Sequence, residues 1–180
     1  MRRMKKLLAA LLLAALTLTL LAGCSTAEDR TYLNDLHEAY VSHCKYDGDM
    51  ERTSTMDAKA QKVLGYLQSA LTVDEDTETV DEAAVELLES TESEMITLLQ
   101  LDLSQNGYYI SVSAVPVLEN GMYDKTRISG VAGRLYWNCA DYYISGASYA
   151  NSEIKVGYAI GKLNGKTIVV EIEAWPRVKD

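Results

Sequence analysis

Two runs of alternating residues near the C-terminus constrain the fold most. From Glu153 to Lys162, apolar side chains occupy every second position between lysine, glycine and alanine, and the same period returns from Thr167 to Ala174. A period of two is typical of β-strands, because successive side chains point to opposite faces of a sheet. Only Leu163-Asn164-Gly165 and Lys166 separate the runs, so the sequence predicts an antiparallel hairpin here.

The loop length decides the register of this hairpin. A three-residue loop with Gly165 in the left-handed conformation pairs apolar residues with one another. The predicted pairs are Ile160 with Ile168, Tyr158 with Val170 and Val156 with Ile172, with Lys155 opposite Glu173 on the outer face. A two-residue loop would instead place Glu171 and Glu173 on the same face as Tyr158 and Val156, so the three-residue loop is predicted.

Helical periodicity precedes these strands. Apolar residues three or four apart predict a helix over 31–44. A second helix is predicted through Leu71, opened by Ser54-x-x-Asp57, and a short third helix is opened by the capping box Thr79-x-x-Glu82.

The segment 94–118 fits two interpretations. Leu98, Leu99 and Leu103 could continue a helix, but Asn106-Gly107 is a strong signal for a two-residue hairpin turn. That turn would pair Leu103 with Ile110. The hairpin is therefore predicted, while 129–145 is left open between a helix and an irregular segment because of its glycines. The order of elements predicts an α+β fold with N-terminal helices, followed by an antiparallel sheet of hairpins, in a single domain.

The N-terminus has the pattern of an export signal. Residues 1–6 contain four basic residues, and Leu7 to Ala22 contains no charged side chain. This apolar run is shorter than the ~20 residues that a membrane-spanning helix needs. The run ends in Leu21-Ala22-Gly23-Cys24, which resembles the lipobox of bacterial lipoproteins. In that family the cysteine carries a thioether-linked diacylglycerol and becomes the first residue of the mature chain.

The resemblance implies three parts: a signal peptide over 1–23, a short lipidated tether over 24–30 and one domain over 31–180. Two acyl chains hold a protein firmly to a bilayer, because each buried methylene contributes ~0.8 kcal/mol. The membrane, contacted through the lipid on Cys24, is thus the first expected partner. The expected location is the extracytoplasmic face of the cell membrane. Ser25 also leaves sorting to an outer membrane open.

The charge excludes one class of partner. The whole chain has a formal net charge of −9, and the predicted signal peptide removes four bases and no acids. A strongly acidic mature chain has no basic patch for nucleic acid, so no nucleic-acid partner is predicted.

Cys44 and Cys139 remain after lipidation of Cys24. In an exported protein they could form a disulfide, or both could stay as buried thiols. The sequence leaves these two outcomes open.

No convincing catalytic or metal site is found, and no cofactor is predicted. His37 and His43 are six residues apart, whereas a zinc-protease helix needs a spacing of four to turn both imidazoles to one metal. The carboxylate runs at 47–51 and 74–78 lack the glycine and glutamate of a calcium loop. Cys139 has no residue that would orient it as a nucleophile.

Tyrosine replaces phenylalanine in this chain, which has 12 tyrosines, two tryptophans and no phenylalanine. Eight of the tyrosines lie from Tyr108 onward. Tyrosine combines an apolar face with a polar tip, which suits sugar or peptide recognition as well as ordinary packing at sheet edges.

The segment from Leu135 onward is similar to the CAP (cysteine-rich secretory protein) superfamily. There a helix with a tryptophan, here Trp137, leads to a final hairpin, matched by Val156-Gly157-Tyr158-Ala159-Ile160 and Asn164-Gly165-Lys166. Tyr143 stands where the family has a histidine, and the family's Gly-Glu-Asn segment has no counterpart. The resemblance therefore implies a copy without the His/Glu site, and it assigns no site residue.

These observations favour a lipid-anchored, non-enzymatic domain of the cell envelope that binds a protein, peptide or glycan. The alternative is a divergent envelope hydrolase or metal-binding enzyme, related to the CAP superfamily, that uses carboxylates and His43. A third hypothesis is a structural accessory of a larger assembly at the membrane.

Overall fold

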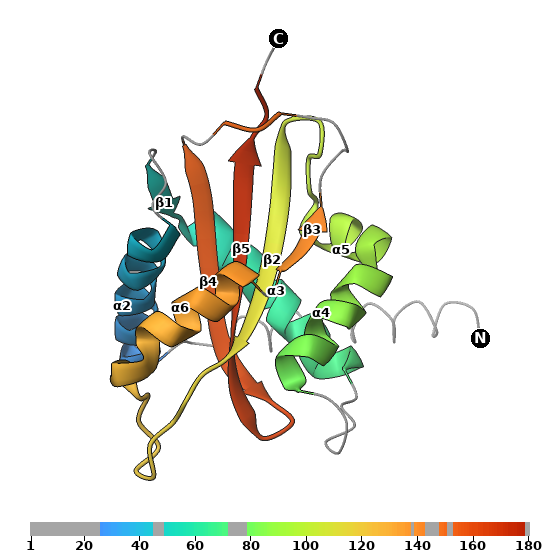
Figure 1. Cartoon of the computed structure of the whole chain (residues 1–180). Helices are drawn as coiled ribbons and strands as arrows, with labels where there is room; N and C mark the ends of the chain where they lie inside the picture. Colours follow the sequence, from blue (N-terminus) through green and yellow to red (C-terminus); the bar gives the residue numbers. More distant parts are fainter. Residues whose placement is uncertain are drawn as a thin grey trace, which may run out of the picture.

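The computed structural model describes residues 26–44, 49–71, 79–137, 139–142, 148–150 and 153–178. They form one mixed β-sheet with helices packed on both of its faces (Figure 1). The α+β class predicted from the sequence is confirmed.

The helices are α2 (Ala27–Cys44), α3 (Ser54–Ala70), α4 (Val80–Ser90), α5 (Glu92–Leu99) and α6 (Ile128–Trp137), with a short 3₁₀ helix η1 (Lys125–Arg127) before α6. The strands are β1 (Met50–Arg52), β2 (Asn106–Ala114), β3 (Cys139–Tyr142), β4 (Ile154–Leu163) and β5 (Lys166–Pro176). Their order in the sheet is β1-β4-β5-β2-β3.

The sheet differs from the predicted series of hairpins. Strand β1 pairs parallel with β4, and the other three pairs are antiparallel. Among these pairs only β4 and β5 are joined by a tight turn, because α6 lies between β2 and β3 in the chain.

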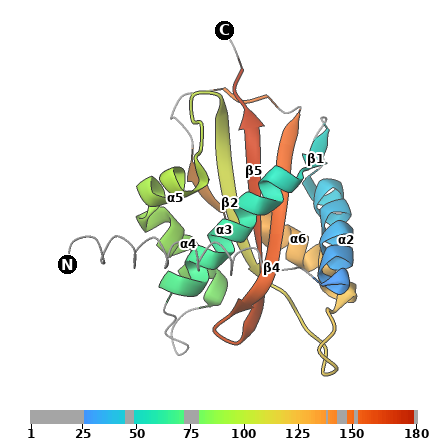
Figure 2. The ribbon, with the colours of Figure 1, turned by 180° about the vertical axis from the view of Figure 1, so that it is seen from behind.

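Each face of the sheet buries its own apolar cluster. On one face α3, α4 and α5 pack over Ile110, Val170 and Ile172 (Figure 2). On the other face α2 and α6 pack over Val156 and Val169. Both faces of the central strands are therefore covered, so their side chains alternate between two interiors rather than between an interior and solvent.

Helix α3 approaches β4 closely at Gly157. A Cβ placed on this glycine would lie 2.0 Å from the backbone carbonyl carbon of Met56. No other residue type fits here without moving the helix, so Gly157 fixes the spacing between α3 and the sheet.

Two predicted helix starts have different outcomes. The capping box at Thr79 and Glu82 is present, with the Thr79 side chain accepting from the Glu82 backbone N–H. For α3 the N-cap is Thr53 rather than Ser54, and its side chain accepts from the backbone N–H of Met56. The helix itself was predicted, and the start was wrong by one residue.

The hairpin predicted around Asn106-Gly107 is wrong. Residues 92–99 form α5, because Met95 and Leu99 lie one turn apart and are both buried against the first cluster. Asn106 and Gly107 are the first residues of β2 and pair with β5. Gly107 lies close to Tyr149, since a Cβ there would lie 2.8 Å from the tyrosine ring, which would have to shift.

The ambiguous segment 129–145 divides into two elements. Helix α6 continues through Gly130 and Gly133 and ends at Trp137. Strand β3 follows almost at once and pairs with β2. A turn at Glu119-Asn120-Gly121 precedes these two elements, with Gly121 at a φ of 84°.

Helix α2 begins at Ala27, inside the range 24–30 that the sequence assigns to the tether. None of the helices in the described ranges is both long enough and apolar enough to cross a membrane.

Candidate functional site

The register of the β4–β5 hairpin determines the site. Asn164 and Gly165 both have positive φ angles, 46° and 76°, as in a two-residue type I′ turn. Tyr158 consequently lies opposite Glu171, and Val156 lies opposite Glu173. The predicted three-residue loop is wrong by one residue in register.

This register places two glutamates in the interior between the sheet and the α2–α6 layer. Glu171 is 0% exposed and Glu173 is 4% exposed. They lie two residues apart on β5, so their side chains point to the same face. Charged residues are almost never this buried unless they are paired, which marks the position as unusual.

Burial raises the pKa of both carboxyls, because a charged carboxylate loses its hydration there. The charge of Glu173 raises the pKa of Glu171 further. The hydroxyls of Tyr40 and Tyr158 act in the opposite direction on Glu171 but do not outweigh burial. The two acids are therefore held toward their neutral forms.

Hydrogen bonding leaves part of this pair unsatisfied. Glu173 Oε2 accepts a hydrogen bond of 2.8 Å from the Trp175 indole Nε1. Glu173 Oε1 and both oxygens of Glu171 accept no hydrogen bond of good geometry among the described residues, although the hydroxyls of Tyr40 and Tyr158 lie close enough to Glu171, and that of Tyr40 close enough to Glu173, to lower the pKa of these acids. Buried polar atoms without partners are uncommon in folded proteins and often mark functional positions.

Glu173 lines a pocket of about 380 Å³ between the sheet and the covering helices. The lining side chains are Tyr40 from α2, Tyr109 and Ser111 from β2, Leu135, Tyr136 and Trp137 from the end of α6, and Glu173 and Trp175 from β5. The volume is within the range of small-molecule sites, and a mainly aromatic lining with a few polar groups is typical of them.

The aromatic rings of the pocket pack against one another at steep angles. Tyr109 and Trp175 have ring centroids 5.7 Å apart with an interplanar angle of 65°. Tyr136 and Trp137 are 5.2 Å apart at 88°. Edge-to-face packing of this kind supports each ring. Trp137 is nevertheless 77% exposed, an unusual position for a side chain of its size.

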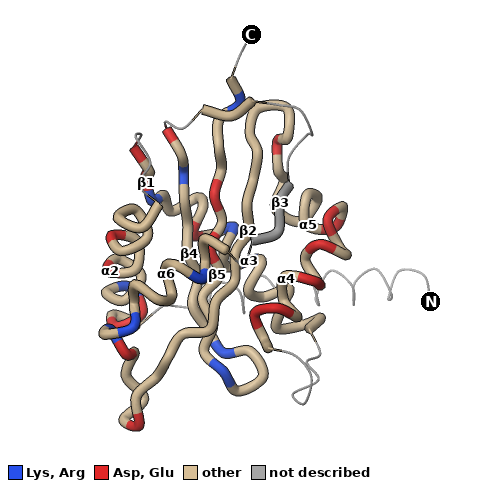
Figure 3. The backbone as a smooth tube through the Cα atoms, viewed as in Figure 1, with Lys and Arg blue, Asp and Glu red and all other residues tan. Residues whose placement is uncertain are grey.

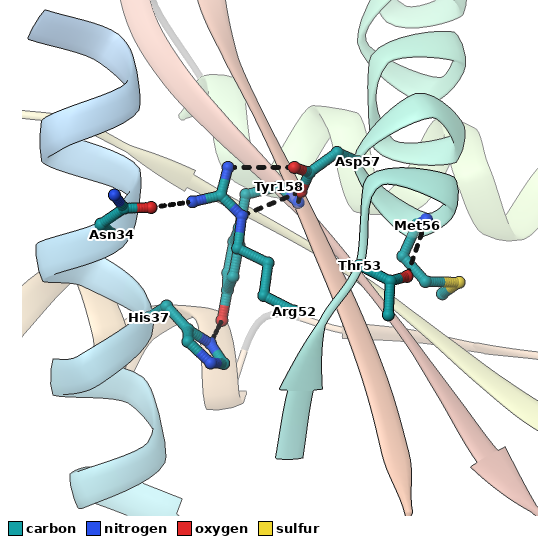
Figure 4. Close-up of polar contacts among 7 residues, drawn as sticks. All are labelled: Asn34, His37, Arg52, Thr53, Met56, Asp57 and Tyr158. Carbon is teal, nitrogen blue, oxygen red and sulfur yellow. Dashed lines mark hydrogen bonds and ion pairs between the residues drawn. The ribbon is translucent and has the colours of Figure 1, made fainter.

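A second polar cluster lies between α2 and the first turn of α3, next to β1 (Figure 4). The guanidinium of Arg52 donates to both carboxylate oxygens of Asp57, each at 3.1 Å, and to Asn34 Oδ1 at 2.7 Å. Asp57 Oδ1 also accepts from the backbone N–H of Tyr158 at 2.8 Å. Arg52 thus joins β1, α2 and α3, and its charge is already matched by Asp57.

His37 connects this cluster to the buried acids. Its Nδ1 lies 3.3 Å from the Tyr158 hydroxyl (Figure 4). That hydroxyl in turn contacts Glu171. Burial and the charge of Arg52 lower the pKa of His37. A line of polar side chains therefore runs through the layer beneath α2, from Arg52 to the pocket.

The residues singled out in the sequence lie mostly elsewhere. Cys24 and the carboxylate run 74–78 lie outside the described residues, as do residues 47 and 48 of the run 47–51. His43 packs against the ring of Tyr136, whereas His37 packs against Tyr158. In the described ranges, no three His, Cys, Asp or Glu side chains are grouped so that they could hold a metal ion.

The predicted pairing of Cys44 with Cys139 stays open. Cys44 is the last residue of α2 and is partly buried. Cys139 begins β3, where only the backbone is described.

The sequence analysis missed Glu171 and Glu173 as site residues. Their signal was present in the alternation of β5, where both acids fall between branched apolar residues. Both acids were expected on a solvent-exposed face, because nothing in a single strand reveals that helices cover both faces.

Comparison of the chain with protein-family models, with curated proteins and with solved structures finds no significant match to any of them.

Proposed function

We propose that this chain is a lipid-anchored extracytoplasmic lipoprotein whose domain binds a small ligand without transforming it. The lipobox-like Leu21-Ala22-Gly23-Cys24 supports the anchor and the location. The domain would then lie close to the outer face of the membrane, because α2 begins at Ala27.

The pocket around Glu173 carries the binding part of the proposal. Glu173 is nine-tenths buried, lines a cavity of about 380 Å³ and has one oxygen without a hydrogen-bond partner among the described residues. An unsatisfied buried acceptor costs about 1–3 kcal/mol, and a ligand that donates to it would recover that free energy. Aromatic walls supply the apolar contact area that a small ligand needs.

Expression of the full chain in a bacterial host tests the anchor. Intact-mass analysis of the membrane fraction should find a chain that begins at Cys24 and carries an added diacylglyceryl mass. The variant Cys24→Ser should lose that mass and leave the membrane fraction. An unmodified chain in either the membrane or the cytoplasm would contradict the anchor.

Intrinsic fluorescence tests the pocket, because Trp137 and Trp175 are the only tryptophans in the chain and both line it. The mature lipoprotein in phosphatidylglycerol vesicles can be titrated with probes of different chemistry, namely glucose, glycine amide, acetate and choline. We expect at least one probe to change the emission in a saturable way. No saturable response to any probe would contradict a binding role for this pocket.

A further inference from the structure

The two buried acids have no cationic partner within the described part of the chain. None of the ion pairs found there includes Glu171 or Glu173. Besides burial, the groups that act on the pKa of Glu171 are Glu173 and the hydroxyls of Tyr158 and Tyr40, and those that act on the pKa of Glu173 are the Trp175 indole and the Tyr40 hydroxyl. Arg52, the arginine of the polar cluster beside α2, is already held by Asp57 and Asn34. Two acids in an interior therefore lack the positive charge that normally accompanies them.

Aromatic rings form most of the wall beside Glu173. Tyr40, Tyr109, Tyr136, Trp137 and Trp175 all line the same pocket. The faces of such rings are electronegative and attract ammonium groups, most strongly when the cation is desolvated. A carboxylate within an aromatic wall combines the two features that recognise an alkylated ammonium group.

We propose that this pocket binds an organic cation, an alkylammonium group that lies against the aromatic rings and pairs with Glu173. The inference rests on the proposed binding function of the pocket and adds the chemical class of its ligand. The bound cation takes the place of the proton that burial keeps on the carboxyls. Trp175 holds Glu173 Oε2 through its indole N–H, and Oε1 is the oxygen of Glu173 without a hydrogen-bond partner among the described residues.

Other ligand classes fit this lining less well. A calcium or magnesium ion requires six or more oxygen ligands, and the pocket offers one carboxylate, one serine hydroxyl and tyrosine hydroxyls among apolar groups. An anion would be repelled by the carboxylate of Glu173 in the pocket wall. A neutral polyol could use the rings but would leave the charge of Glu173 unmatched when it ionises.

A pair of probes that differ only in charge tests the proposal. Choline and its neutral isostere 3,3-dimethyl-1-butanol have the same shape, with nitrogen replaced by carbon. Tryptophan emission of the mature lipoprotein in phosphatidylglycerol vesicles, at pH 8, should report choline binding at least tenfold tighter than binding of the isostere. Vesicles of phosphatidylcholine are avoided because their head group is itself an alkylammonium.

Matched variants assign the effect to the pocket. Glu173→Gln keeps the shape of the side chain and should remove the preference for choline over the isostere. Glu51→Gln makes the same change at an exposed position on β1 and should leave the preference intact. Trp137→Leu, at a position 77% exposed and so without consequence for folding, should weaken choline binding severalfold while Trp175 still reports it.

A third probe separates two sources of the same chemistry. Nα-acetyl-lysine methylamide represents a lysine side chain of a protein, and choline represents a free small molecule. Tenfold preference of either over the neutral isostere supports the proposal, and the tighter one identifies the source. Equal binding of choline and its isostere, or binding of glucose alone, would overturn the cation while leaving a binding pocket. If no probe changes the tryptophan emission, the proposed binding function of the pocket is overturned as well.

Discussion

Tyr158 on β4 lies directly opposite Glu171 on β5, and this one pairing places both glutamates of β5 beneath the covering helices. A shift of one residue would turn the acids to the α3 face and the branched apolar residues toward α2. The two-residue turn at Asn164-Gly165 selects the observed pairing, because both residues take the positive φ angles that a type I′ turn needs.

The buried acids should make stability depend on pH. Both pKa values are raised by burial above the ordinary glutamate value of about 4.3. A group whose pKa is raised by folding contributes stability that is complete below its unfolded pKa and is lost as the pH rises through its folded pKa. The wild-type chain should therefore lose stability relative to the double variant Glu171→Gln/Glu173→Gln as the pH rises from about 4.

Urea unfolding of both proteins at each pH measures this difference. The difference in the free energy of unfolding should change by about 1.4 kcal/mol per pH unit for each carboxyl, at pH values between its unfolded and its folded pKa. His37, whose pKa is lowered by burial and by the charge of Arg52, is present in both proteins and therefore cancels in the difference. A difference that is independent of pH would contradict the raised pKa values.

Gly157 should tolerate no side chain. A Cβ at this position would lie 2.0 Å from the backbone of α3, so Gly157→Ala must separate the helix from the sheet. We expect a loss of about 3 kcal/mol or more in the free energy of unfolding. Gly130→Ala on α6 is the matched control, because the nearest atom to its Cβ is 3.9 Å away. That change should instead stabilise the protein by about 0.5–1 kcal/mol. Similar effects of the two substitutions would argue against this packing of α3.

Arg52 should contribute more to stability than an exposed arginine in a similar pair. Its guanidinium contacts Asp57 and Asn34, and its side chain is 18% exposed. Arg52→Lys loses the bidentate geometry and should cost about 1–2 kcal/mol. Arg127 pairs with Asp124 at 3.6 Å but is 73% exposed, so Arg127→Lys should change stability by less than about 0.5 kcal/mol. Urea unfolding of the two variants compares them directly, and an equal cost would show that Arg52 acts as an ordinary surface charge.

Trp175 should lower the pKa of Glu173, the acid that its indole contacts. Its indole N–H donates to Glu173 Oε2, and this hydrogen bond lowers the pKa of Glu173 against the effect of burial. Trp175→Phe keeps an aromatic ring but removes the donor, so the pKa of Glu173 should rise further. Carbon-detected NMR of the glutamate carboxyl groups measures the change. A fall in the pKa would contradict the assigned donor role.

The sequence predicted the elements of this fold better than their pairing. Apolar periodicity located α2, α3 and the strands β4 and β5, since each buries a face that its own residues define. The predicted register of β4 and β5 was wrong because one face of the hairpin was expected to be exposed, whereas α2 and α6 cover it. That covering depends on helices distant in the chain, and α2 lies more than a hundred positions before β5, which no local pattern reveals.

Turn signals in the sequence also failed where contacts distant in the chain decide the structure. Asn106-Gly107 has the composition of a hairpin turn, yet it begins β2, because α5 buries Met95 and Leu99 and thus removes the partner strand. The pocket could not be predicted for a related reason. Its lining combines residues of α2, β2, α6 and β5. Many acidic residues lie along α2, α4 and α5 (Figure 3), so the acidic composition did not indicate that Glu171 and Glu173 are buried between the sheet and the α2–α6 layer.

The most direct test of the account is a carbon-detected NMR titration of the glutamate carboxyl groups in the mature chain, with and without saturating choline. The variants Glu171→Gln and Glu173→Gln assign the two resonances. We predict that both titrate above the ordinary value of about 4.3 in the free protein and that the pKa of Glu173 falls when choline binds. Titration of every glutamate near the ordinary value, unchanged by choline, would contradict both the buried acids and the cation site.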